Sequence, residues 1–169
     1  MYDTIIQNCA RIYKIDEKLI RAIIQTESSW NPWAIRVERG FWNNYLEGIK
    51  DIFVKSGVDR KWLAYPDLVS TSYGLMQLML TTAMELGFRF TFPTELLDPG
   101  TNIKWGCALL KQLFTRYGTW EDAIASYNQG NNRKRTDGKY ANQEAYVDIV
   151  LTYWKEEGER DDRRPDGTD

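Results

Sequence analysis

The sequence predicts an all-α domain, and three observations support this expectation. Apolar residues recur at i, i+3, i+4 and i+7 along most of the 169-residue chain, the period of helices that bury one face. No segment alternates apolar and polar residues over the length of a strand. The length suits one domain with a substantial core. We expect this domain to span residues 1–158, and the charged segment 159–169, with its Pro and Gly, to be a disordered tail.

Two helices are predicted at the start of the chain. Residues 3–13 place apolar side chains at helical spacing, and Asp16 can cap a second helix that runs to about Glu27. Pro32 restricts the residue before it, which favours a helix end near Glu27. Three isoleucines precede Glu27 at i, i+3, i+4 and i+7 spacing, so its carboxyl group falls on the apolar face. They are Ile20, Ile23 and Ile24.

This placement predicts unusual chemistry for Glu27. An ionised carboxylate is costly on an apolar face, and the partial negative charge of a helix C-terminus disfavours it further. Both effects predict a raised pKa for Glu27, which suits a general acid near neutral pH. The alternative is a Glu at a helix end that turns out to solvent.

The middle of the chain predicts two more helices. Residues 41–56 have helical periodicity and are followed by a glycine at position 57. The next segment is irregular. Residues 73–86 then read as a helix with Ser72 as its candidate N-cap, followed by a loop rich in Phe and Pro.

Three helices complete the prediction. The first covers residues 101–117, and the second begins at Thr119, which resembles a capping box with Asp122, and ends before Gly130. A polar loop then leads to Asn142, the candidate cap of the last helix. The basic run 133–135 lies in this loop and reads as a solvated surface.

Composition narrows the function classes. A net charge of −2 argues against a dedicated nucleic-acid binder. The absence of histidine excludes Ser-His and Cys-His mechanisms and the common zinc ligand sets, so we expect no metal and no cofactor, and carboxylates as the acid–base groups. Cys9 and Cys107 occupy apolar helix positions and read as buried thiols, with a disulfide as the alternative. No stretch is long and apolar enough to span a membrane, and the first residues lack the features of a signal peptide.

Four stretches in order carry a family resemblance. They are TESSWNPWA (26–34), SYGLMQLMLTTA (72–83), LLDPGTNIKWGCALL (96–110) and SYNQG (126–130), followed by AYV (145–147). Together they resemble the SLT-type lytic transglycosylases, lysozyme-like enzymes that cleave peptidoglycan glycan strands, and are similar to phage-encoded members. The resemblance implies a lysozyme-like fold of about seven or eight helices with a substrate groove. It also implies peptidoglycan strands as the partner, and we expect a monomer.

The resemblance also assigns the site. Glu27 corresponds to the single catalytic acid, which would protonate the glycosidic oxygen and then, as a base, promote closure of a 1,6-anhydro-MurNAc ring. The substrate-binding positions would be Ser28, Ser72, Gly74, Met76, Gln77, Tyr127, Asn128 and Tyr146. By pattern alone, the two tyrosines read as core residues, Gln77 as a solvent-facing helix residue and Ser28 as a local backbone partner.

The sequence departs from the family pattern between Glu27 and Gly74, where the interval is long. The serine that usually precedes GLMQ would fall at Leu68, so Ser70 or Ser72 can replace it. The interval begins with Ile35-Arg36-Val37-Glu38, similar to an AxRxE run in phage-type members, and we expect its helix 41–56 to form one wall of the groove.

Two other functions stay open. A hydrolytic muramidase similar to goose-type lysozyme would need a second carboxylate, for which Glu38 is the first candidate. A glycan-binding or virion structural module without activity is the other. Because the substrate lies in the cell wall, we expect action in the periplasm or outside the cell, after delivery by a phage particle or removal of a leader.

Overall fold

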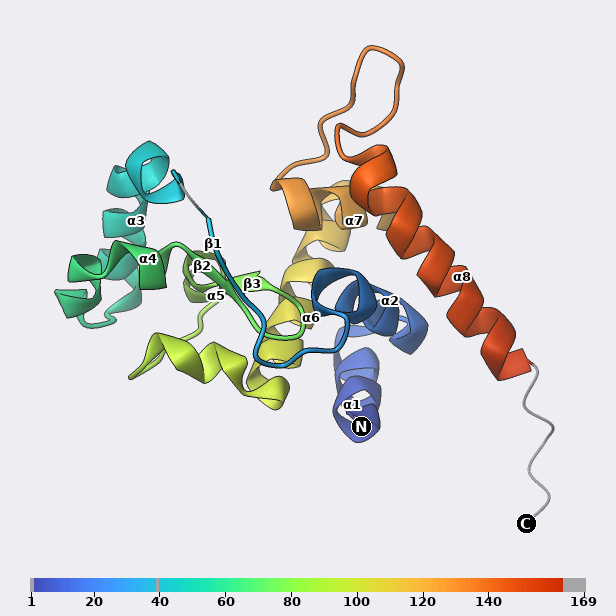
Figure 1. Cartoon of the computed structure of the whole chain (residues 1–169), viewed down its shortest axis with the longest axis horizontal. Coiled ribbons are helices and arrows are strands. Elements are labelled where there is room, and N and C mark those ends of the chain that lie inside the picture. Colours follow the sequence, from blue (N-terminus) through green and yellow to red (C-terminus); the bar gives the residue numbers. More distant parts are fainter. Residues whose placement is uncertain (1, 39, 163–169) are drawn as a thin grey trace. The chain divides into compact units, whose positions relative to one another are not determined.

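The computed structural model describes residues 2–38 and 40–162, and within them it is mostly helical (Figure 1). The α-helices are α1 (Asp3–Tyr13), α2 (Glu17–Ser28), α3 (Phe41–Ser56), α4 (Pro66–Val69), α5 (Leu80–Glu85), α6 (Pro99–Tyr117), α7 (Trp120–Gln129) and α8 (Asp148–Asp162). Three short strands are β1 (Ile35–Val37), β2 (Thr71–Tyr73) and β3 (Leu78–Met79). Single 3₁₀ turns cover Arg60–Ala64 and Pro93–Leu97, and a π turn covers Gln143–Val147. The all-α expectation is confirmed, with a small sheet added.

The chain forms two compact units. One comprises Met1–Thr26 and Leu110–Asp169, and the other comprises Glu27–Leu109. No helix in the described residues is long and apolar enough to cross a membrane. Cys9 and Cys107 are both buried, as predicted.

In the first unit, the start of α2 is fixed by Asp16. Its Oδ1 accepts a hydrogen bond from the Lys18 backbone N at 2.9 Å, which confirms the predicted cap. Its Oδ2 accepts one from Trp154 Nε1 of α8 at 2.8 Å. One carboxylate therefore caps α2 and holds α8 beside it. Helix α8 continues to Asp162, so residues 159–162 of the expected tail are helical, and 163–169 lie outside the described residues.

Helix α7 has the predicted ends, whereas the cap predicted at Asn142 is wrong. Thr119 Oγ1 accepts from the Asp122 backbone N at 3.1 Å, and Gly130 ends the helix with φ of 79°. The Asn142 side chain makes no capping hydrogen bond to the turn that follows it, although its backbone carbonyl accepts from the Tyr146 backbone N at 2.9 Å. Its Nδ2 instead donates to the Ala125 carbonyl of α7 at 3.1 Å. A contact with a distant helix has replaced the local cap.

In the second unit, a three-stranded antiparallel sheet replaces the first half of the helix predicted at 73–86 (Figure 1). The strand order is β1-β2-β3, and Ser72 pairs with Arg36 on one side and Met79 on the other. Ser72 is therefore a strand residue and not an N-cap. Nearly every side chain from Thr71 to Leu80 is buried, so the apolar pattern there does not distinguish a helix from a strand.

The core of the second unit lies between α3 and α5. Ile49 and Phe53 of α3 are each 1% exposed and pack with Ala83 and Met84 of α5. Helix α3 ends as predicted, at Gly57 with φ of 71°, and is kinked at Tyr45.

Two aromatic residues near the start of α3, Trp42 and Tyr45, have different surroundings. Trp42 packs against the core, whereas Tyr45 is 58% exposed. We expect Trp42→Ala to lower the free energy of unfolding by about 1–3 kcal/mol, because it removes a large apolar contact. Tyr45→Ala should change it by less than about 1 kcal/mol. Urea unfolding of both variants checks this, and an equal loss in the two would contradict the assignment of Trp42 to the core.

Candidate active site

Glu27 occupies the last turn of α2, which ends at Ser28 as the sequence predicts. The two following residues, Ser29 and Trp30, have φ values of 50° and 67°. Residues other than glycine seldom adopt this left-handed conformation, and each costs of order 1–3 kcal/mol. The chain therefore turns sharply after Glu27. The Glu27 side chain is half-buried.

Ser28 joins the end of α2 to a turn far along the chain. Its Oγ donates to the Leu75 carbonyl oxygen at 2.8 Å. Leu75 lies in the turn 74–77 that connects β2 to β3. The hydroxyl next to the candidate acid thus fixes the GLMQ turn relative to Glu27.

The GLMQ turn requires glycine at position 74. Gly74 has φ of 71°, and a Cβ placed on it would lie 2.7 Å from Asn102 Nδ2 and 2.9 Å from the Leu96 carbonyl oxygen. Both the conformation and the space therefore exclude a side chain. Within this unit, the group that approaches position 74 is the Asn102 amide.

Asn102 is a residue of the site that the sequence reasoning missed. It is fully buried on α6, and its Oδ1 accepts from the Met76 backbone N at 2.7 Å. Its Nδ2 donates to the carbonyl oxygens of Tyr73 at 2.7 Å and Leu96 at 2.9 Å. One amide thus holds both sides of the turn. An Asn beside Ile103 on the apolar side of a helix was the available signal, since buried polar groups need partners.

Gln77 is buried at 8% exposure, so the solvent-facing alternative is wrong. Its backbone has φ of 44°, and its Nε2 donates to the carbonyl oxygens of Ala34 and Gly74, each at 3.0 Å. Both amide hydrogens are therefore used within the protein. A substrate contact from this conformation would come from Oε1, as an acceptor.

Met76 packs between the GLMQ turn and α6. Its side chain is fully buried, and a Cβ on Gly106 would overlap its Sδ. In this structure the side chain has no exposed surface with which to touch a substrate. Its part in the site is to pack the turn against α6.

Glu38, the candidate second carboxylate, is anchored beside the sheet. Its Oε1 accepts from Arg36 Nε at 2.7 Å and from Ser72 Oγ at 3.1 Å. The Ser72 side chain is almost fully buried, at 1% exposure. Ser72, which was expected to bind substrate, therefore holds the Glu38 carboxylate. The long interval between Glu27 and Gly74 positions this carboxylate because β1, which lies in the interval, pairs with β2.

The remaining candidates belong to the other unit. Tyr127 and Asn128 lie in the last turn of α7, where Tyr127 is half-buried and Asn128 exposed. Asn128 Oδ1 accepts from Asn142 Nδ2 at 3.0 Å. Tyr146 is 5% exposed in the π turn before α8, a type of turn found often at functional sites. Within residues 2–38 and 40–162, no three His, Cys, Asp or Glu side chains gather as metal ligands would.

The structure therefore sorts the predicted residues into two sets. The second unit holds Glu27, Ser28, Glu38, Ser72, Gly74, Met76 and Gln77, and the first holds Tyr127, Asn128 and Tyr146. Within the second unit, hydrogen bonds link the end of α2, the GLMQ turn and the sheet.

Comparison with known proteins identifies the family of the chain. The chain is 32% identical over 127 residues to a protein named transglycosylase from Enterobacteria phage PRD1, an alignment covering 75% of this chain and 34% of that protein. The structure is similar to an inactive mutant of the lytic transglycosylase Slt from Pseudomonas aeruginosa, with a TM-score of 0.66 and 21% identity, over 95% of this chain and 24% of that one. This confirms the lysozyme-like fold, and the chain corresponds to only a third and a quarter of these two proteins. The model of the transglycosylase SLT domain matches residues 4–150, and the chain belongs to that family.

Proposed function

We propose that this domain is a lytic transglycosylase that cleaves the β-1,4 bond between MurNAc and GlcNAc in peptidoglycan strands. The observation that carries the proposal is the setting of Glu27. Within a domain of the transglycosylase SLT family, this Glu ends α2, precedes a strained turn and is tied through Ser28 to the GLMQ turn. Strain and long-range fixation around a single acid are typical of active sites.

The proposed reaction uses one carboxyl group twice. Glu27 first donates its proton to the glycosidic oxygen, and the bond from that oxygen to MurNAc C1 breaks. The substrate's own acetamide stabilises the cationic sugar. The Glu27 carboxylate then takes the proton of the C6 hydroxyl while O6 bonds to C1, which closes the 1,6-anhydro ring. An intramolecular hydroxyl competes well with water because its effective concentration is very large.

Other residues would hold the substrate and the acid in place. We assign Gln77 Oε1 and Asn128 to polar contacts with sugar substituents, and Tyr127 and Tyr146 to substrate binding. Four other residues would act indirectly, because their contacts fix the turn that carries Gln77. They are Ser28, Gly74, Met76 and Asn102.

A hydrolytic muramidase is the second candidate, and the anchoring of Glu38 favours it. Two donors, Arg36 and Ser72, hold this carboxylate in one position, as a base that activates water would require. In that reaction the products would keep a reducing end.

Release of soluble fragments from purified sacculi tests the proposal. We expect the domain to clear a sacculus suspension and to liberate sugar-containing fragments at a rate that rises with protein concentration. Tight binding to sacculi without release of fragments would indicate a glycan-binding module and would contradict the proposed enzyme.

A further inference from the structure

The loop between α7 and the π turn is a folded hairpin. Lys134 and Tyr140 form an antiparallel bridge, and the Arg135 backbone N donates to the Lys139 carbonyl at 2.7 Å. Gly138, with φ of 82°, provides the reversal. The sequence predicted only a solvated loop here, so the structure adds a defined surface.

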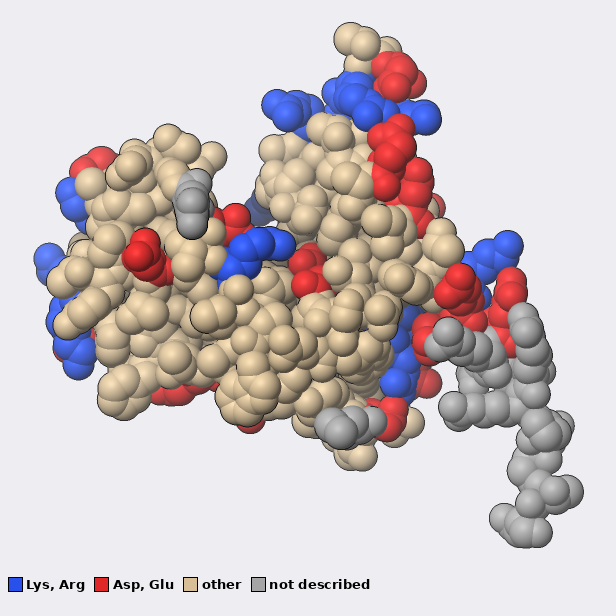
Figure 2. Space-filling model, viewed as in Figure 1, with Lys and Arg blue, Asp and Glu red and all other residues tan. Residues whose placement is uncertain are grey.

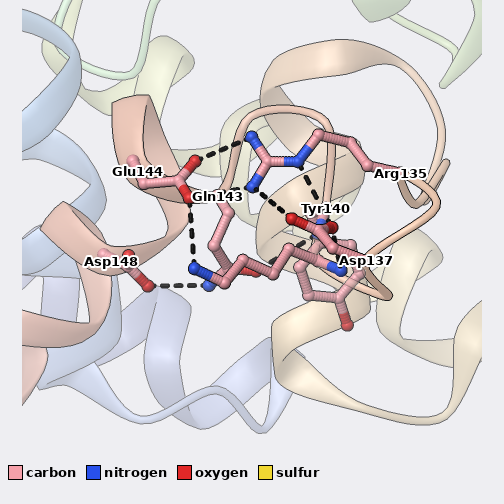
Figure 3. Close-up of polar contacts among 7 residues, drawn as sticks. Arg135, Asp137, Tyr140, Gln143, Glu144 and Asp148 are labelled. Carbon is pink, nitrogen blue, oxygen red and sulfur yellow. Dashed lines mark hydrogen bonds and ion pairs between the residues drawn. The ribbon is translucent and has the colours of Figure 1, made fainter.

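Ion pairs hold one side of the hairpin (Figure 3). The Arg135 guanidinium donates to both Glu144 oxygens, at 2.9 and 2.8 Å, and also pairs with Asp137. Lys139 Nζ lies 3.3 Å from the same Glu144 carboxylate. The hydrogen bond from Arg135 lowers the pKa of Glu144 to about 2. Arg135 and Lys139 are therefore engaged within the protein.

Partly buried polar contacts hold the other side. Tyr140 OH donates to Asp122 Oδ1 at 3.0 Å, and Asn132 Nδ2 donates to the same oxygen at 3.2 Å. Burial and this hydrogen bond raise the pKa of Tyr140 to about 12. Burial would raise the pKa of Asp122, but hydrogen bonds from Thr119, Tyr140 and Asn132 outweigh it and lower that pKa. The hairpin is thus attached to the first turn of α7.

Two cations of the hairpin have no carboxylate at ion-pair distance among the described residues, although the charge of Lys134 contributes to lowering the pKa of Asp122. Arg133 and Lys134 are exposed, and neither forms an ion pair with another described residue. The Arg133 backbone is nevertheless fixed, because its carbonyl accepts from Gln129 Nε2 at 3.2 Å and from the Ala141 backbone N at 3.0 Å. Lys134 Nζ lies 4.8 Å from the centre of the Tyr140 ring. Figure 2 shows basic side chains gathered on this hairpin, at the top of the view.

The hairpin rises directly from the proposed substrate-binding end of α7. The Asn128–Asn142 hydrogen bond joins the two ends of the segment that carries it. If Asn128 faces the glycan strand, the cations stand beside that strand, where peptide stems branch from MurNAc. These stems carry free carboxylates, which Arg and Lys bind well.

We propose that Arg133 and Lys134 bind carboxylates of the peptide stem, so that the domain prefers strands that keep their stems. This proposal rests on the proposed function for its substrate. Two cations suit a ligand with a few carboxylates better than they suit a polyanion. A polyanion needs an extended basic face, and the net charge of −2 argues against one.

A charge-removing double variant, Arg133→Gln with Lys134→Gln, tests the proposal. Neither side chain forms a hydrogen bond or an ion pair with another described residue, so the fold should be kept, which circular dichroism checks. The control is Lys111→Gln with Arg116→Gln in the same unit. It removes the same charge, and its cations also lie near aromatic rings, at 5.2 Å from Phe114 and 6.0 Å from Tyr117.

Each protein is assayed on sacculi freed of phosphodiester polymers by acid, before and after an amidase removes the stems. We expect the test variant to lose about threefold to thirtyfold in kcat/KM on stem-bearing sacculi, the range for two exposed ion pairs. Its rate on stripped strands should equal that of the unmodified protein, and the control should change neither rate. Added salt should shrink the difference.

Three outcomes would overturn the proposal. An equal loss on both substrates would make the cations glycan-binding or structural, and no loss on either would leave them without a role. Untreated sacculi that keep their phosphodiester polymers are assayed in parallel, and a loss seen only on these would assign the cations to phosphate. If the unmodified protein cleaves neither substrate, the proposed function fails, and co-sedimentation with the same two substrates still decides whether the cations bind stems.

Discussion

Replacing Glu27 with Gln is expected to reduce the release of fragments from sacculi by about 10²–10⁴-fold. The amide keeps the shape of the side chain and removes the proton that the first step requires. It also removes the base of the second step, so the loss should approach the upper end of that range. Release is measured by chromatography of the soluble fraction, and circular dichroism checks the fold.

Two further Glu-to-Gln variants test whether the loss of activity is specific to Glu27. Glu47 is exposed on α3 in an ion pair with Lys50, so Glu47→Gln should retain full activity. Glu38→Gln separates the two reactions: it should cost less than about tenfold for a lytic transglycosylase and most of the activity for a hydrolase. If Glu27→Gln retains more than a few per cent of the activity, Glu27 is not the acid.

Asn102→Ala is expected to lower the free energy of unfolding by about 2–4 kcal/mol. The substitution removes three hydrogen bonds in a fully buried place and leaves the Met76 N–H without its acceptor. Asn102→Asp should also be destabilising, because a carboxylate oxygen would face the carbonyls of Tyr73 and Leu96. Denaturant unfolding measures both variants.

The matched control for Asn102 is Asn43→Ala on α3. Asn43 is exposed, so its replacement should change stability by less than about 0.5 kcal/mol. Because the GLMQ turn carries Gln77 and accepts the hydrogen bond of Ser28, Asn102→Ala should also reduce activity under conditions where it stays folded. A variant as stable as the Asn43 control would show that Asn102 does not hold the turn.

Local chemistry made the helix ends predictable. Asp16 and Thr119 cap their helices through side-chain bonds to residues two or three positions away, and Gly57 and Gly130 supply the left-handed residue at the other end. These interactions lie within one turn of the chain, so the sequence contains all of the information they need.

Interactions between distant segments could not be predicted in the same way. Strand β2 pairs with β1 on one side and with β3 on the other. The buried residues around these strands do not alternate between apolar and polar, so the sequence does not indicate strands there. Asn142 bonds to α7, and Asn102 bonds across the turn, in both cases through partners that only the fold brings close. The hydrogen-bond partners of Ser28 and Gln77 are also distant in sequence. The sequence therefore predicted the identity of the candidate site residues better than it predicted their contacts.

The mass of the reaction products tests the central claim most directly. Sacculi digested by the domain are analysed by mass spectrometry without prior reduction of the muropeptides. The account predicts 1,6-anhydro-MurNAc ends, lighter than hydrolytic products by one water and without a reducing end. Products that end predominantly in reducing MurNAc would contradict it, and would make the domain a muramidase in which Glu38 activates water.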